Sequence, residues 1–182
     1  MNIPENIFDC PDKFQSERNG LKINCIKDVI GQFKVENYKI TVGDKLGISL
    51  FTPVKMISGT YQIVKYVWNH DIVGSINVGI LIRHEKTIGG SKKCVQIMQT
   101  YAPHISDGIP VDSACISIIG GNKCFDIESG LGDGVYPVYG LKKFLSKYNS
   151  IYIDLMIWNV RRVIITDDSK FDKYQIAVSS SQ

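Results

Sequence analysis

The stretch TYQIVKYVWNHDIVGSINVGILI, residues 60–82, decides the fold class of this chain. Two runs rich in β-branched and aromatic side chains flank Asn69-His70-Asp71, whose side chains tolerate the backbone of a tight turn. In the second run the even positions are almost all apolar, whereas Ser75 and Asn77 fall on odd positions. A period of two is typical of a strand with one buried face. We therefore predict a β-hairpin whose second strand is half-exposed.

The same pattern continues on both sides of this hairpin. Short apolar runs alternate with turn signals such as Gly43-Asp44, Gly89-Gly90 and Gly120-Gly121 at intervals of roughly ten residues, a spacing typical of sandwiches and barrels. We predict strands near 21–26, 36–42, 47–52, 59–68, 72–84, 93–100, 113–119, 123–128, 135–139, 151–158, 160–166 and 172–178.

Composition supports a mostly β chain. The 182 residues include 27 Ile and 15 Val but only 8 Leu and 3 Ala, so side chains that favour strands far outnumber strong helix formers. We expect antiparallel sheets, arranged as a β-sandwich or an open barrel, with at most one short helix. Residues 1–20 should form an irregular N-terminal arm, residues 21–178 a single β-rich domain, and residues 179–182 a frayed tail.

Residues 140–149, GLKKFLSKYN, are the one helix candidate. Leu141, Phe144, Leu145 and Tyr148 follow the i, i+3, i+4, i+7 spacing of an apolar helical stripe. The same ten residues could instead be the end of a long hairpin that leads into the run at 151–158. Both interpretations stay open at this stage.

Charge and cysteine content argue against several classes of function. A net charge of +3 is too small to indicate a nucleic-acid-binding protein, and no uncharged apolar run is long enough to span a membrane. The five cysteines are scattered without a CxxC pair, and there are only three histidines. We therefore expect free thiols in a reducing compartment and no metal or cofactor. Without a signal-like N-terminus, the expected location is the cytoplasm or a virion.

The segment GGNKCFDIESGLGDGVYPVYG, residues 120–140, is the most unusual part of the sequence. It places Asp126, Glu128 and Asp133 among six glycines. Carboxylate oxygens beside flexible backbone could hold Ca²⁺, but the spacing does not match an EF-hand loop. The structural alternative is that the glycines serve turns and that Pro137 marks an edge strand or a bulge. We favour the structural alternative.

Two catalytic arrangements are conceivable. Ser113 or Cys115 could act as a nucleophile with His84 or His104 as the base, although no G-x-S-x-G elbow is present. Cys115 lies in the apolar run SACISII, where an inert buried thiol is the usual outcome.

The other arrangement is a pair of carboxylates. Asp126 and Glu128 would share one face of an extended strand, as glycosidase carboxylates could. Aromatic side chains that could line a sugar cleft are also present: Trp68, Tyr136, Tyr139 and Trp158.

Part of the chain resembles a known family. SGLGDGVYPVY at 129–139, preceded by VDSA at 111–114, resembles uncharacterised bacterial and phage proteins related to the DUF4241 family. The strand-forming runs ISGTYQIVKYV and IYIDLMIW extend the resemblance over about residues 57–158. Ala114 stands where the family usually has Gly. The resemblance implies a β-rich fold but no established activity, and it carries over no catalytic residues.

The function that we expect is non-enzymatic: a protein-interaction or structural protein, such as an immunity-type binder or an accessory component of a virion or assembly. Its partner would be another protein or further copies of the chain. The alternative is a small hydrolase, or a Ca²⁺- or ligand-binding domain, that uses the loop at 120–140. In either case the candidate contact residues are the acidic and tyrosine side chains around this loop: Asp112, Asp126, Glu128, Asp133, Tyr136 and Tyr139.

Overall fold

A computed structural model of the chain describes residues 6–18, 21–71, 74–86, 93–97, 99–101, 104–106, 108–130, 132–142, 147–156, 160–164 and 175–178. In these ranges the chain is mostly β, and its strands pair antiparallel in two main sheets and two separate hairpins. The expected fold class is therefore confirmed. No helix in the described ranges is long and apolar enough to cross a bilayer.

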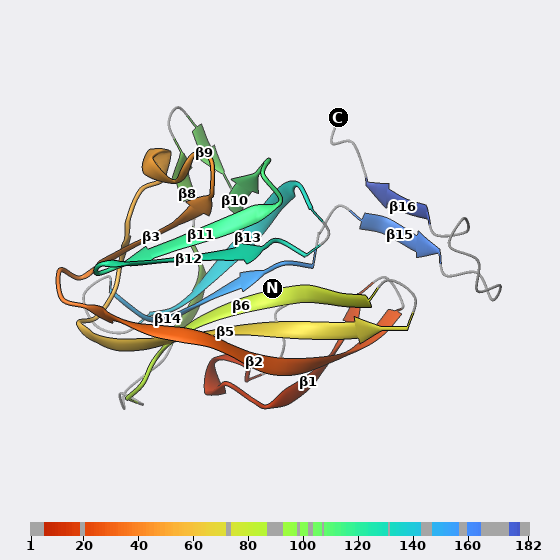
Figure 1. Ribbon diagram of the computed structural model, residues 1–182, viewed down its shortest axis with the longest axis horizontal. Coiled ribbons are helices and arrows are strands. Elements are labelled where there is room, and N and C mark those ends of the chain that lie inside the picture. The colour runs from red at the N-terminus through yellow and green to blue at the C-terminus, as the bar shows by residue number, and fades with distance from the viewer. Residues whose placement is uncertain are drawn as a thin grey trace.

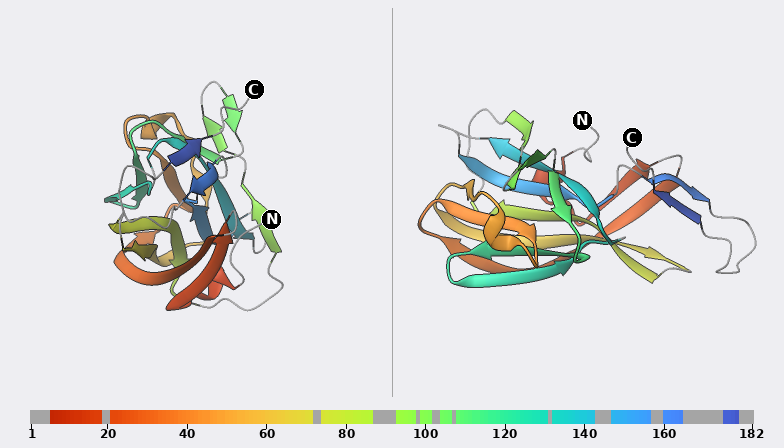
Figure 2. Two further views of the ribbon diagram at one scale, coloured as in Figure 1. Left: turned by 90° about the vertical axis from the view of Figure 1, so that its right-hand side faces the viewer. Right: turned by 90° about the horizontal axis from the view of Figure 1, so that it is seen from above.

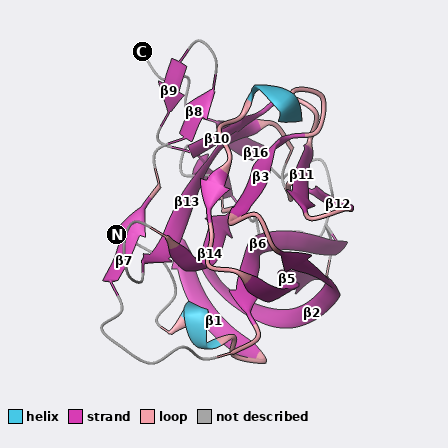
Figure 3. Cartoon of the chain, turned by 90° about the vertical axis from the view of Figure 1, so that its left-hand side faces the viewer, coloured by secondary structure: helices cyan, strands magenta, loops and turns pink. Residues whose placement is uncertain are grey.

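The larger sheet has eight strands and is strongly curled (Figures 1 and 3). Seven strands follow one another in the order β1-β2-β5-β6-β14-β13-β10, and the eighth, β7, pairs with β13. Their bounds are β1 Lys13–Arg18, β2 Leu21–Val35, β5 Gly59–His70, β6 Gly74–His84, β7 Lys93–Gln96, β10 Gly108–Val111, β13 Gly134–Lys142 and β14 Tyr148–Asp154.

The smaller sheet has four strands in the order β12-β11-β3-β4 and lies across the curled sheet (Figure 2). Its strands are β3 Lys39–Asp44, β4 Val54–Lys55, β11 Cys115–Gly120 and β12 Lys123–Glu128. Two hairpins form sheets of their own, β8 Gln99–Tyr101 with β9 His104–Ser106, and β15 Val160–Ile164 with β16 Gln175–Val178. Two single 3-10 turns, η1 Ile7–Asp9 and η2 Ile48–Leu50, complete the described elements.

The main hydrophobic core lies between the two sheets. Alternate residues of the large sheet point into it, and the inward residues of the small sheet meet them, as the period of two requires. Its fully buried members include Tyr61, Ile80, Ile116, Tyr136 and Ile153. This core positions the ends of β3, β10, β11 and β13, which meet at one edge of the molecule.

A second core covers the opposite face of the large sheet. There η1 packs on β6 and β14, and Ile7, Ile23, Tyr66, Leu81 and Tyr152 are buried together. Residues 1–20 were expected to be irregular, but the described part contains η1 and the strand β1, which pairs with β2 in full register. The apolar side chains of this segment cover a sheet face that would otherwise be exposed to solvent.

That second core corrects the prediction of a half-exposed strand at 72–84. In β6, Leu81 is buried in the second core, while Ile80 and Ile82 are buried in the first. A β-bulge between Tyr66 and Val67 of the neighbouring strand leaves Val78 without an opposite residue and reverses the alternation along β6. Both faces of this strand are therefore buried over 78–82.

Two further predictions concern the local backbone. Residues 47–52 were expected to form a strand, but they contain η2, because Asp44 caps the preceding turn and closes it. The helical interpretation of residues 140–149 is wrong where the structure describes them, since 140–142 belong to β13 and 148–149 to β14. Residues 143–146 lie outside the described ranges.

Candidate functional site

The loop between β10 and β11, which contains the VDSA motif, is held by carboxylates. The backbone N–H groups of Asp112 and Ser113 donate to Oδ2 of Asp44 at 2.6 and 2.9 Å. The next N–H, that of Ala114, donates to Oδ1 of Asp133 at 3.1 Å. Three consecutive amides thus donate to two acidic side chains from different parts of the chain. This arrangement fixes the loop, residues 112–114, against both the end of β3 and the glycine-rich turn before β13. We call these residues the pinned loop.

Asp44 is the centre of this arrangement. Its second oxygen, Oδ1, accepts the N–H of Leu46 at 2.7 Å, so one carboxylate receives three backbone hydrogen bonds. Asp44 is only 8% exposed. Burial alone would raise its pKa, but the N–H groups of Asp112, Leu46 and Ser113 outweigh burial and hold the pKa below the ordinary value. Asp44 is therefore ionised at neutral pH and ties two loops together.

The GDG part of the GDGVYPVY segment supports the same loop from the other side. Ser129 donates its N–H to the carbonyl of Ala114 at 3.0 Å and its hydroxyl to the carbonyl of Gly132 at 2.6 Å. The Tyr136 hydroxyl also donates to the Gly132 carbonyl. Gly132 has a φ of 107°, a conformation that a side chain would disfavour. The start of the GDGVYPVY motif is therefore a hydrogen-bonded turn that holds Asp133 in place.

Asp126 lies apart from this loop, on the outer face of the small sheet. Its Oδ1 accepts a hydrogen bond from the Ser117 hydroxyl on the opposite strand, and its Oδ2 forms an ion pair with Nζ of Lys45 at 2.9 Å. The Ser117 hydroxyl and the Lys45 ammonium hold the pKa of Asp126 below its ordinary value. Its carboxylate is thus engaged in links within the small sheet.

The six candidate residues therefore do not converge on one site. Asp126 and Glu128 share the exposed face of β12, with Ile127 buried between them, as expected. Tyr136 is fully buried in the first core, whereas Tyr139, 3% exposed, lies in the second core on the other side of the sheet. Asp112 and Asp133 lie at the pinned loop, where only Asp133 uses its carboxylate to hold it.

The candidate nucleophiles Ser113 and Cys115 and the candidate base His84 lie in environments that favour a structural role. The Ser113 hydroxyl donates to the Cys115 carbonyl at 3.0 Å, and burial raises the pKa of the Cys115 thiol, which disfavours the thiolate. The imidazole of His84 accepts the Lys86 N–H at Nδ1, and its Nε2 lies 3.2 Å from the Ser58 carbonyl. His84 is therefore held as the Nε2-protonated tautomer between two backbone groups. The side chains of His104 and Trp158 lie outside the described residues.

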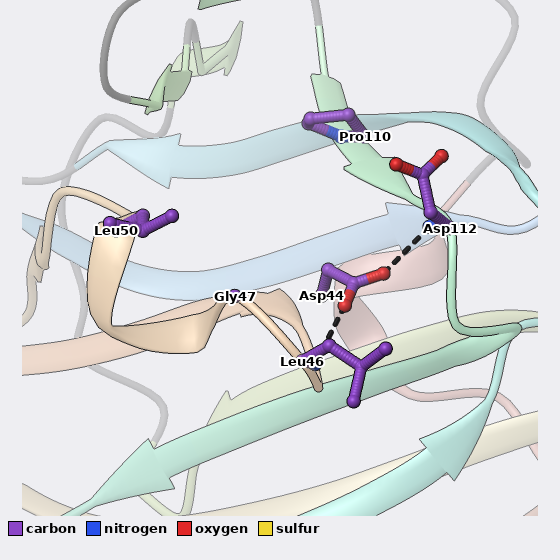
Figure 4. A pocket seen from close by; sticks show the side chains of 6 residues that line it. All are labelled: Asp44, Leu46, Gly47, Leu50, Pro110 and Asp112. Carbon is purple, nitrogen blue, oxygen red and sulfur yellow. Dashed lines mark hydrogen bonds between the residues drawn. The ribbon is translucent and has the colours of Figure 1, made fainter.

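A surface cavity of about 310 Å³ opens beside the pinned loop. Its polar lining is Asp44 and Asp112, and its apolar lining includes Leu46, Leu50 and Pro110 (Figure 4). Leu46 is 84% exposed, the highest value among the exposed large apolar residues that the structure describes, and Leu50 is 48% exposed, like Val29 on β2. The Asp112 carboxylate extends away from Asp44 on the side of Pro110 in Figure 4.

Reasoning from the sequence did not identify Asp44, Leu46 or Leu50 as parts of a site. Gly43-Asp44 was predicted as a turn, but both residues end strand β3 and the turn follows them. An aspartate beside a turn is common and does not indicate a distant partner. The sequence did hold one signal for this loop, an apolar residue among turn-forming ones: Leu46 follows Gly43-Asp44-Lys45 and precedes Gly47. A leucine at such a position must either pack back on the core or be displayed.

Among the described residues, no three His, Cys, Asp or Glu side chains come together in a way that could hold a metal ion. Comparison with known proteins finds no family model that matches the chain, no similar curated protein and no similar solved structure. The resemblance to DUF4241-related proteins therefore remains a prediction.

Proposed function

We propose that this protein is a non-enzymatic protein-interaction component, and that the loop of residues 44–50 is its contact. The observation that carries the proposal is the exposure of Leu46, which is 84% exposed although its backbone N–H is held by the Asp44 carboxylate. The N–H groups of Asp112 and Ser113 hold that carboxylate in turn. Leu50 stands on the same loop and widens the apolar surface. An immunity-type binder and an accessory protein of a virion or other assembly both fit this class.

Rigidity is the reason why this loop suits recognition. Binding costs free energy for each side chain and loop that must be ordered, and a loop already held in one conformation avoids much of that cost. An apolar centre with a polar rim is also the usual anatomy of a protein–protein interface. Here the surrounding polar groups are Asp112 and the Lys45–Asp126 pair.

The alternative of a hydrolase or a Ca²⁺ site in residues 120–140 has less support. The carboxylate of Asp133 accepts a backbone N–H, and that of Asp126 receives a hydroxyl and a lysine, so both are used in holding the fold. Tyr136 is buried with its hydroxyl on the carbonyl of its own turn. No described observation favours a reaction at these residues over a structural role.

Site-specific photo-crosslinking tests the proposal. A photoreactive phenylalanine analogue is placed at position 46, and at position 29 as a control, in the cells that make the protein. Val29 is 48% exposed on β2 and lies outside the cavity lining. We expect one discrete adduct, heavier than the 20.4 kDa chain, from position 46 and none from position 29. Absence of an adduct at position 46, or equal adducts at both positions, would contradict the proposal.

A further inference from the structure

The cavity beside the displayed leucines has a definite chemistry. Its described lining contains two carboxylates, Asp44 and Asp112, and no basic side chain. The nearest lysine in sequence, Lys45, has its ammonium 2.9 Å from Asp126 on the small sheet. The cavity therefore presents negative charge that the lining itself does not balance. Its volume of about 310 Å³ is at the lower end of the range for ligand pockets, roughly 300–1,000 Å³.

The two carboxylates have different roles. Asp44 accepts three backbone N–H groups and is buried, so it supplies charge but few free acceptor positions. Asp112 is exposed, and only its backbone N–H takes part in holding the loop. Its side chain stands at the rim on a backbone that cannot easily move. A charged donor that enters the cavity would meet the Asp112 oxygens first.

Resting on the proposed function, we infer that this cavity receives an arginine side chain that projects from the protein partner. A planar guanidinium can donate two parallel hydrogen bonds to the two oxygens of one carboxylate, which matches the single available carboxylate of Asp112. Its methylene stem and flat faces would lie on Leu46, Leu50 and Pro110. The ionised Asp44 below adds attraction without requiring a hydrogen bond of its own.

The cavity should distinguish arginine from other side chains of similar length. A lysine ammonium would gain the same charge attraction, but it has no planar fork for the Asp112 carboxylate and is more strongly hydrated. An uncharged chain of similar length would gain only the apolar contacts with the two leucines and Pro110. Affinity should therefore fall from arginine to lysine and be lowest for norleucine.

A titration followed by ¹H–¹⁵N NMR of the full chain tests this order. The probes are N-acetyl-arginine N-methylamide and its lysine and norleucine counterparts, each added to millimolar concentration. We expect the arginine probe to shift the amide signals of Leu46, Gly47 and Asp112. In Asp112→Asn the affinity for this probe should fall about two- to fivefold, the effect of one partly exposed ion pair. That variant keeps the backbone N–H that donates to Asp44.

Glu128→Gln is the matched control, because it removes one exposed carboxylate from β12, outside the cavity lining. Its affinity for the arginine probe should stay at the wild-type value. No shifts at the cavity amides, equal shifts with norleucine, lysine binding as tight as arginine, or equal losses in both variants would each overturn the inference. The crosslink at position 46 does not depend on Asp112, so an intact crosslink with a failed titration removes the arginine inference and leaves the proposed function standing.

Discussion

Asp44 shows how one side chain connects segments that are far apart in the sequence. Its partners Asp112 and Ser113 are 68 and 69 residues away, yet the three N–H donors fix β3, η2 and the loop before β11 relative to one another. Hydrogen bonds to a charged acceptor are about twice as strong as neutral ones and contribute about 1.5–3 kcal/mol each in favourable cases. The displayed leucines depend on this residue for their fixed position.

We predict that Asp44→Asn lowers the free energy of unfolding by about 1.5–3 kcal/mol at pH 7, because the amide loses the charge and presents N–H groups to N–H donors. The folded-state pKa of Asp44 lies below its unfolded value, so its contribution is complete above about pH 5 and is lost as the pH falls through the folded pKa. The difference between variant and wild type should therefore shrink at pH 3. Urea unfolding at pH 7 and pH 3 measures it.

Asp112→Asn serves as the control for that comparison. It removes an exposed carboxylate from the same loop but keeps the backbone donor, so its free energy of unfolding should stay within about 0.5 kcal/mol of wild type. If the two variants unfold at the same urea concentration, Asp44 does not have the structural role described above.

Ala114 offers a test with the opposite sign. Its φ is 52°, in the left-handed region that costs an alanine about 1–2 kcal/mol, and the side chain is exposed. Gly avoids this strain but loses about 0.5–1 kcal/mol through the entropy of the unfolded chain. Ala114→Gly should therefore raise the free energy of unfolding by about 0.5–1 kcal/mol, measured by urea unfolding. A decrease in stability would show that the loop does not impose this conformation.

At the scale of elements, close contacts between glycine and aromatic rings set the packing of the small sheet on its surroundings. Gly43 of β3 lies under Phe51, the residue that follows η2, and an added Cβ would fall 2.3 Å from the ring atom Cδ2. Phe51 is buried in the first core. The end of β3 and the return of the chain after the displayed loop are thus joined by one ring on one glycine.

We predict that Gly43→Ala lowers the free energy of unfolding by about 1–3 kcal/mol through overpacking. In the background of Phe51→Leu, which makes room, the same alanine should cost clearly less, so the two changes should not be additive. Equilibrium unfolding of both single variants and the double variant gives the interaction free energy. Additivity within about 0.5 kcal/mol would mean that the ring does not press on this glycine.

Most strands could be predicted from the sequence, because apolar runs and turn residues are local signals. The run at 123–128 was predicted with the bounds that β12 has, and the hairpin of β5 and β6 was also predicted. Its turn was placed too early, because Asn69 and His70 are the last paired residues of β5. What failed depended on distant partners. The bulge opposite Val78 and the second core under β1 exist only once strands have paired, and η2 replaced a strand because the Asp44 side chain closed the turn.

The candidate site shows the same limit more sharply. Asp112 was named at the VDSA motif and Asp133 in the glycine-rich segment, and both lie at the pinned loop. Tyr136 and Tyr139 were grouped with them, although opposite faces of one strand send these two rings into different cores. Asp44 was missed because its partners lie 68 and 69 residues further along the chain. Spacing along a sequence can show which side chains share a strand face, but it cannot show which loops meet at the edge of a sandwich.

At the scale of the whole molecule, two cores on opposite faces of one curled sheet leave the edge with β3, η2 and β10 as the place where loops are displayed. Leu46 and Leu50 belong to neither core, and Figure 4 shows both on the loop that follows Asp44. A contiguous exposed apolar patch with a polar rim marks a surface that another protein covers, and our proposal assigns that role to Leu46 and Leu50. If these leucines form the contact, the chain should be found in a complex.

The native mass of the protein tests this expectation most directly. Light scattering on a sizing column is applied to the tagged chain, isolated gently from the cells that make it, together with the double variant Leu46→Ser/Leu50→Ser and the control Val29→Ser. We predict that the wild type and the control elute as a species heavier than the 20.4 kDa monomer, and that the folded double variant elutes at the monomer mass. A wild-type protein at the monomer mass, or a double variant as heavy as the wild type, would contradict the account.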